Sequence, residues 1–144
     1  MEIKLETLLA GGPDDAFRAW TQAGEITRWW GEDGVYRTVA WAADVEAGGA
    51  WRADFADHAG DAFSAEGRYI EALAPERLVW TWSASWSPDI SNTIDMTFTA
   101  EPDGTRLQLR NFGFSSLEEC EEAREGWTQI LGWLAVYLAD TAED

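Results

Sequence analysis

The spacing of apolar residues changes once along this chain, near residue 115, and this change constrains the fold more than any other feature. Before it, apolar and polar residues alternate, as they do in strands with one buried face. The alternating segments are 3–9, 35–45, 50–57, 63–73, 77–86, 92–101 and 105–114. The pair Pro88-Asp89 predicts a turn between the fifth and sixth of these segments. After the change in spacing, apolar residues recur every three or four positions, the pattern of an amphipathic helix over 117–140. Those residues are Trp127, Ile130, Leu131, Leu134, Tyr137 and Leu138.

Two short helices are predicted between the first strand and the others. Pro13 and the two acids after it are typical of a helix start, and we expect Gly24 to end this helix. A second helix is expected over 25–31. Because Trp29 and Trp30 are adjacent on it, we expect one ring to enter the core and the other to face a pocket mouth or a partner.

The order of these segments predicts an α+β fold. An antiparallel sheet of this kind buries one face, and the last helix is the only long element available to cover it. We therefore expect a curved antiparallel sheet wrapped around a long C-terminal helix, with two short helices after the first strand. A chain of 144 residues suits a single domain over 1–144.

The charge balance excludes several partners. With 27 acidic and 10 basic residues, the formal net charge is −17. Such a chain repels phosphate backbones and anionic membrane surfaces, so we expect neither nucleic acid nor a membrane as a partner. The charge is interpreted as keeping an aromatic-rich protein in solution, the alternative being an acidic surface matched to a basic partner. No apolar run approaches 18 residues, and we expect a cytoplasmic protein.

Residues suited to catalysis or metal binding are sparse. The one histidine, His58, falls in a predicted turn at 58–61, and the one cysteine, Cys120, lies in an acidic segment that disfavours a reactive thiolate. Metal sites usually draw on several such residues, so we expect no metal. Nor does Gly48-Gly49 have the pattern of a phosphate-binding loop, so no cofactor is expected.

The carboxylates give no catalytic assignment either. Asp95 alternates with inward-facing apolar neighbours and should face away from the core, as should Glu66. The acidic run at 118–122 is interpreted as a solvated helix start. Negative charges near a helix N-terminus are favourable to the helix dipole, so these glutamates need no catalytic explanation. We therefore assign no catalytic residue and favour a protein that is not an enzyme.

The aromatic residues carry the stronger signal. In LVWTWSASW (78–86), Trp80 and Trp82 fall on the inner face of a strand and Trp86 lies near its end. A filled core explains any one ring, but many flat rings beside the small residues Ala65 and Gly67 favour a groove for a flat apolar ligand. The candidate ligand-binding residues are Trp30, Trp51, Phe55, Tyr69, Trp80, Trp82, Met96, Phe98, Trp127 and Leu131.

Four segments, in this order, carry a family resemblance. They are AFRAWTQAGEITRWWG (16–31), DVEAGGAWRADF (44–55), EGRYIEALAPERLVWTW (66–82), and FGF (112–114) before a helix containing GW (126–127). Together they resemble the START-like (SRPBCC) superfamily. The closest similarity is to the branch related to the C-terminal domain of the ATPase activator of the ninety-kilodalton heat-shock chaperone.

The resemblance implies a helix-grip (Bet v-like) fold with a cavity between sheet and helix that takes an apolar or aromatic small molecule. Many relatives have a histidine two residues before the glycine of the last strand's GF pair. Asn111 stands there in this chain, so a role tied to an imidazole is not expected.

Three functions follow as hypotheses. The first is binding of a small apolar or aromatic ligand between the sheet and the last helix. The second is a co-chaperone-like interaction module that stimulates a partner ATPase through its acidic surface, although relatives that do so carry a second domain. The third is a cyclase or hydrolytic resistance enzyme using the same cavity. Exposed tryptophans would make a homodimer possible. The family resemblance makes a chaperone a possible partner.

Overall fold

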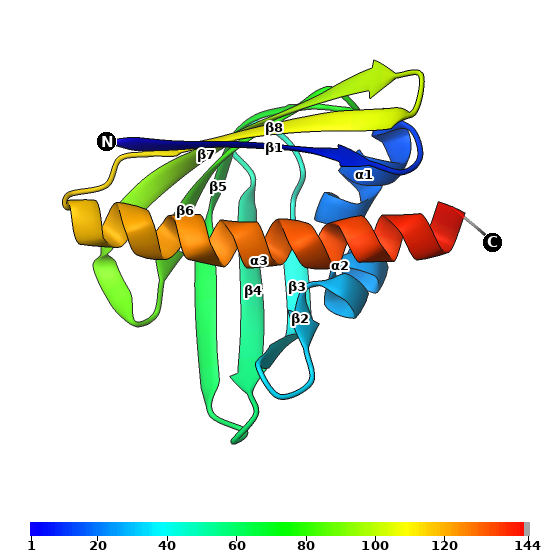
Figure 1. Ribbon diagram of the computed structural model, residues 1–144. Coiled ribbons are helices and arrows are strands. Elements are labelled where there is room, and N and C mark those ends of the chain that lie inside the picture. Colours follow the sequence, from blue (N-terminus) through cyan, green and yellow to red (C-terminus); the bar gives the residue numbers. More distant parts are fainter. Residues whose placement is uncertain (143–144) are drawn as a thin grey trace.

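The computed structural model describes residues 1–142 and confirms the α+β helix-grip architecture (Figure 1). One eight-stranded antiparallel sheet curls around a long helix, with strand order β1-β8-β7-β6-β5-β4-β3-β2. The strands are β1 (Glu2–Leu9), β2 (Gly31–Glu32), β3 (Tyr36–Ala43), β4 (Ala50–Asp57), β5 (Ala62–Leu73), β6 (Arg77–Ala84), β7 (Ser87–Glu101) and β8 (Gly104–Phe112). The helices are α1 (Pro13–Thr21), α2 (Ala23–Trp29) and α3 (Leu117–Ala142). Within residues 1–142, none of these helices is both long and apolar enough to cross a membrane.

The break between the two short helices lies at Gln22, and the prediction that Gly24 ends the first helix is wrong. Gln22 has extended backbone angles (φ −92°, ψ 126°), so it ends α1 and also precedes the first turn of α2. Gly24 lies in that first turn, where backbone N–H groups have no partner within the helix in any case. A single extended residue was therefore enough to separate the helices.

The turn between β6 and β7 also differs from the prediction. It consists of Ser85 and Trp86, while Pro88 and Asp89 belong to β7. The register is irregular here, since Trp82 pairs with Asn92 but Ala84 pairs with Ser87. A proline is tolerated at the start of a strand or beside a bulge because no ladder hydrogen bond needs its missing N–H. The short turn leaves the Trp86 side chain 61% exposed.

Both adjacent tryptophans are buried: Trp29 lies in the core, as expected of one ring, and Trp30, which was expected at a pocket mouth or a partner, is 1% exposed and lines a pocket from the inside. Trp30 follows the last residue of α2 in a non-helical conformation (φ −84°, ψ 91°), so the chain direction changes between the two rings. They stack with centroids 5.8 Å apart. The indole N–H of Trp29 donates to the Ala19 carbonyl at 2.9 Å, which satisfies that polar group inside the core.

Gly67 allows two strands to approach rather than opening a groove. A Cβ added at this position would collide with the backbone carbonyl of Thr81 on β6. That same carbonyl accepts a hydrogen bond from the indole N–H of Trp51 at 2.9 Å. The other small residue, Ala65, is buried in the core. Gly67 therefore leaves room for the Trp51 indole to reach the Thr81 carbonyl, and neither Gly67 nor Ala65 lines the pocket described below.

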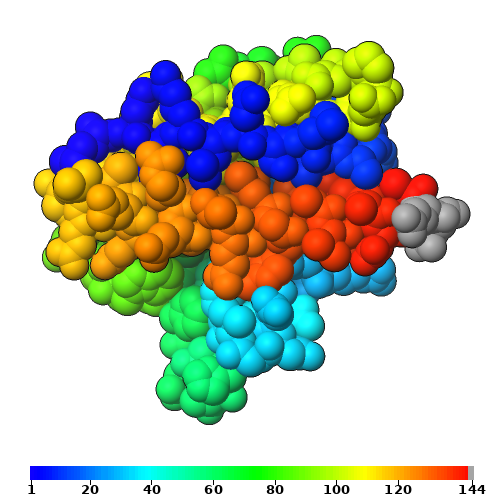
Figure 2. Space-filling model, in the orientation of Figure 1, coloured from blue at the N-terminus to red at the C-terminus, as the bar shows by residue number. Residues whose placement is uncertain are grey.

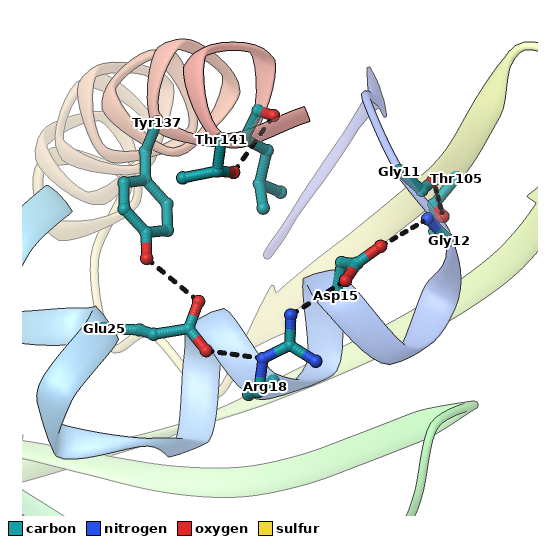
Figure 3. Close-up of polar contacts among 9 residues, drawn as sticks. Gly11, Gly12, Asp15, Arg18, Glu25, Thr105, Tyr137 and Thr141 are labelled. Atoms are coloured by element: carbon teal, nitrogen blue, oxygen red, sulfur yellow. Dashed lines mark hydrogen bonds and ion pairs between the residues drawn. The ribbon is translucent and has the colours of Figure 1, made fainter. Parts of the chain in front are cut away.

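A chain of polar contacts attaches the C-terminal half of α3 to α1 and α2 (Figure 3). The Tyr137 hydroxyl donates to Glu25 at 2.9 Å, and the other Glu25 oxygen accepts from Arg18 at 2.6 Å. Arg18 also contacts Asp15, whose carboxylate accepts the Gly12 N–H that precedes α1. Exposed pairs of this kind contribute little energy each, but they fix where α3 lies.

The N-terminal half of α3 crosses the concave side of the sheet. The helix packs against β1 along its length, and Figure 2 shows its residues lying directly against those of the first strand. It also contacts α1, α2 and β2. The first turns of α3 therefore lie over the curve of β4–β7 without packing closely on those strands.

Candidate ligand pocket

A pocket of about 420 Å³ lies between the first half of α3 and the concave face of the sheet. This volume falls in the range of small-molecule sites. Residues from the six strands β3 to β8, from the β6–β7 turn, from the segments just after α2 and β8, and from α3 meet there. The lining residues are Trp30, Tyr36, Phe55, Phe63, Trp82, Ala84, Trp86, Ser87, Ile90, Asn92, Asn111, Phe114, Glu119, Glu122, Ala123, Gly126, Trp127 and Ile130.

Eight of the eighteen lining residues are aromatic, and most of these rings contact one another. Trp30 stacks on Trp82 with centroids 5.9 Å apart and an interplanar angle of 17°. Phe55 stacks on Phe63 at 5.1 Å, and the edge of Trp127 meets Trp82 at 6.0 Å. Such contacts add to the hydrophobic stabilisation and restrict each ring to one orientation. The pocket therefore offers flat apolar surfaces that are already ordered.

Asn111 is the central polar group of the pocket and is 1% exposed. Its side-chain oxygen accepts from the Trp127 indole N–H at 2.9 Å. Its side-chain nitrogen donates to the Asn92 side-chain oxygen and to the Thr93 carbonyl, each at 2.8 Å. Because Asn111 lies on β8, Asn92 on β7 and Trp127 on α3, this one amide joins three elements around the pocket.

Tyr36 supplies a second polar group. Its hydroxyl oxygen accepts from the Trp30 indole N–H at 3.1 Å. Burial raises the pKa of this hydroxyl above its ordinary value, although the hydrogen bond from Trp30 opposes the shift. The group is therefore neutral at physiological pH, and its proton is available to an acceptor on a bound molecule.

Two carboxylates border the pocket at the start of α3. Ser116 accepts the Glu119 N–H at 3.1 Å and so caps the helix. The Glu119 carboxylate in turn accepts from the backbone N–H and the hydroxyl of Ser115, both at 2.9 Å. Glu119 is half-buried and Glu122 is exposed. The prediction of a solvated helix start describes Glu122, whereas Glu119 is held at the edge of the pocket.

The structure divides the ten predicted ligand-binding residues into two groups. Four of them line the pocket: Trp30, Phe55, Trp82 and Trp127. The other six are buried in the surrounding core: Trp51, Tyr69, Trp80, Met96, Phe98 and Leu131.

Sequence reasoning did not select Asn111, Tyr36, Phe63, Trp86, Glu119 or Glu122. A signal existed for Asn111, because it continues the inward-facing series of Leu107 and Leu109 on its strand. A polar residue at such a position needs a partner inside the protein. Phe63 shares the alternating face of Ala65 and Tyr69, and Trp86 ends the series of Trp80 and Trp82, so these two residues also carried a signal.

Three of the residues considered for catalysis, His58, Cys120 and Asp95, lie away from the pocket lining. His58 is exposed in the turn between β4 and β5, and Cys120 is buried without lining the pocket. Asp95 faces away from the core as predicted, with its carboxylate 2.8 Å from Arg77. Within residues 1–142, no three His, Cys, Asp or Glu side chains are grouped to hold a metal ion.

Burial of Tyr69 makes stability depend on alkaline pH. The side chain is 2% exposed, and burial raises the pKa of its hydroxyl far above the ordinary value. The folded state keeps this proton where the unfolded chain loses it. The stabilisation is therefore complete below about pH 10 and is lost as the pH rises further. We expect the free energy of unfolding to fall as the pH rises above about 10, and to keep falling with further increase because the folded-state pKa of Tyr69 lies well above that pH.

Urea denaturation at a series of pH values measures this fall, and the Tyr69→Phe variant should show a shallower one. Tyr137→Phe is the comparison variant: burial and the contact with Glu25 also raise the pKa of Tyr137, but this side chain is only half-buried, so its removal should flatten the fall less. An alkaline fall as steep in Tyr69→Phe as in the unchanged protein would contradict the assignment.

The fold and pocket together define a class of protein. A curved antiparallel sheet wrapped around a C-terminal helix, with a pocket beneath that helix, is the START-like architecture. The chain belongs to the family described as Activator of Hsp90 ATPase homolog 1-like protein, whose family model matches residues 12–139. This family and its fold comprise ligand-binding and co-chaperone-like proteins. No curated protein matches the chain.

Solved structures from several bacteria share the fold. A Rhodobacter sphaeroides protein has a TM-score of 0.84 at 18% identity, covering 97% of this chain and 93% of its own. Protein NE0264 from Nitrosomonas europaea has a TM-score of 0.83 at 20% identity, with 100% and 97% covered. An AHSA1-like protein from Aeromonas hydrophila has a TM-score of 0.81 at 23% identity, with 100% and 96% covered. At these identities the likeness establishes the fold alone.

Proposed function

We propose that this protein binds a small, largely apolar and aromatic molecule between α3 and the sheet. The observation that carries the proposal is the pocket of about 420 Å³ with eight aromatic residues in its lining. Ligand sites are mostly apolar concave surfaces with a few placed polar groups, and Asn111, Asn92 and Tyr36 supply such groups here. The ligand would lie against Trp30, Phe55, Trp82 and Trp127.

A glycine on α3 allows a direct test. Gly126 lines the pocket, and a Cβ added there would meet no atom within 4 Å. The substitution Gly126→Phe therefore begins its side chain in open space beside the pocket, and its ring would occupy the volume proposed for the ligand. Replacing a glycine inside a helix also removes a conformational penalty, so the variant should fold at least as well as the unchanged protein.

Binding is measured with a panel of neutral bicyclic aromatics, including 1-naphthylmethanol, added to ¹⁵N-labelled protein. We expect the indole N–H resonances of the pocket tryptophans to shift in the unchanged protein and to remain unshifted in Gly126→Phe. The matched control is Gly132→Phe, an exposed position on the same helix with equal space around it. The proposal fails if no panel member shifts these resonances, or if both variants respond as the unchanged protein does.

A co-chaperone-like interaction module is the second candidate. The family match supports it, as does the exposed acidic surface at the start of α3, where Glu118, Glu121 and Glu125 face solvent. Binding of the purified heat-shock chaperone that weakens with salt and survives Gly126→Phe would favour this function over the pocket. No observation specifically supports the third hypothesis, an enzyme that uses the same cavity.

A further inference from the structure

The pocket lining carries charge of one sign only. Two carboxylates, Glu119 and Glu122, belong to it, and no Lys, Arg or His does. Across residues 1–142, neither carboxylate forms an ion pair with a basic side chain. The basic residue nearest in sequence, Arg124, is exposed and lies outside the lining. The negative charge at this edge of the pocket is therefore not neutralised by the protein.

The two carboxylates occupy one end of the pocket. Glu119 and Glu122 are three residues apart, so they lie on one side of α3, and Trp127 lies about 12 Å further along the axis than Glu119. One oxygen of Glu119 is held by Ser115. Its other oxygen has no hydrogen-bond partner among residues 1–142 and is free to accept from a bound group.

The rings favour the same sign of ligand charge. The face of an aromatic ring carries negative charge density and attracts a cation placed over it. Trp86 and Phe114 belong to the same lining as the two glutamates. An anion entering the pocket would lose its hydration and meet two carboxylates and no basic side chain, with only neutral donors such as the Tyr36 hydroxyl to replace the lost water. The net charge of −17 would also slow its approach.

We propose that the pocket selects an arylalkyl ammonium ion, a compact cation attached to a flat aromatic body. The ammonium group lies at Glu119 and Glu122, and the ring system lies against Trp82 and Trp127. This inference rests on the proposed function, because it specifies which apolar ligands the same pocket prefers. It excludes fatty acids, aryl carboxylates and phosphate esters as preferred occupants.

Three probes with one ring system test the charge preference. They are 1-naphthylmethylammonium, 1-naphthylmethanol and 1-naphthoate, measured by isothermal titration calorimetry at pH 7. We expect the cation to bind about tenfold more tightly than the alcohol, since a partly exposed ion pair and ring contacts together supply a preference of this order. The carboxylate should bind more weakly than either.

Paired charge variants locate the source of the preference. In Glu119→Gln/Glu122→Gln, the cation should bind no more tightly than the alcohol, whose own affinity stays unchanged. The control Glu118→Gln/Glu121→Gln changes the net charge equally at exposed positions outside the pocket lining, and should keep the full preference. Urea denaturation of both variants checks that each is folded.

The outcomes separate this inference from the proposed function. If 1-naphthylmethanol binds but the ammonium ion binds no more tightly, the charge inference is wrong and the apolar pocket function stands. If both pairs of substitutions reduce the preference equally, the net charge of the protein is responsible, and the inference is also wrong. If no probe binds, the proposed function itself fails.

Discussion

Trp30→Ala is expected to lower the free energy of unfolding by about 3–5 kcal/mol, the cost of removing a fully buried large aromatic side chain. Trp30 is 1% exposed and lies at the centre of the aromatic core. Its ring centroid is within 6.5 Å of six others, those of Trp20, Trp29, Trp41, Phe55, Trp82 and Trp127. Those rings belong to α1, α2, β3, β4, β6 and α3, so one truncation loosens contacts among six elements.

Two contributions add up in the loss of stability expected for Trp30→Ala. The first is the lost transfer of the indole from water, and the second is the cavity that neighbouring rings, packed against other elements, cannot collapse to fill. The Tyr36 hydroxyl also loses its hydrogen-bond donor. Urea denaturation followed by circular dichroism measures the change.

Trp86→Ala is the matched control for Trp30→Ala. Trp86 lines the same pocket but is 61% exposed, with one edge contact to Phe63 at 5.6 Å. Its removal should change the free energy of unfolding by less than about 1 kcal/mol, as is usual for exposed side chains. Equal losses in the two variants would show that Trp30 is not central to the core.

Asn111→Leu is expected to cost about 2–4 kcal/mol of stability, because each buried polar group left without a partner costs about 1–3 kcal/mol. The substitution keeps roughly the volume of the side chain but removes three hydrogen bonds. The Trp127 indole N–H, the Asn92 side-chain oxygen and the Thr93 carbonyl all lose their partner. Trp127 should also lose its fixed orientation in the pocket.

A double-mutant cycle tests this account of Asn111. Trp127→Phe removes the indole donor, so Asn111→Leu should cost less in that background than in the unchanged protein, with a coupling of about 1 kcal/mol or more. Urea denaturation of the four proteins measures the coupling. Additive effects would mean that the 2.9 Å contact contributes nothing specific, and would contradict the assigned role of Asn111.

Local errors in the sequence predictions had identifiable causes. Gly24 and the Pro88-Asp89 pair are common at breaks and turns, but here Gln22 and the Ser85-Trp86 pair take those places. Glycine and proline permit a break without requiring one, and the hydrogen-bonding register of the neighbouring elements decides where it falls. Trp29 and Trp30 take the core and pocket positions expected of such a pair, but both are buried because Trp30 lies just beyond the helix.

The inner face of the sheet was predictable, but the division of that face into core and pocket was not. Alternation places Trp51, Phe55, Trp80 and Trp82 on one side of their strands, and the structure has them there. Alternation says nothing about what lies opposite a ring. Trp80 meets Trp20 and Trp127, whereas Trp82 borders the open space.

The amino-acid sequence by itself determined the period of each segment, and hence a curved sheet with one aromatic face and one long helix to cover it. Only the tertiary structure decided where that helix lies. Its C-terminal half is fixed to α1 and α2 through Tyr137 and Glu25, and Trp127 is bonded to Asn111 on β8. These contacts join residues 112 and 16 positions apart in the chain. Such distances leave no trace in local periodicity, yet they set the gap between helix and sheet that forms the pocket.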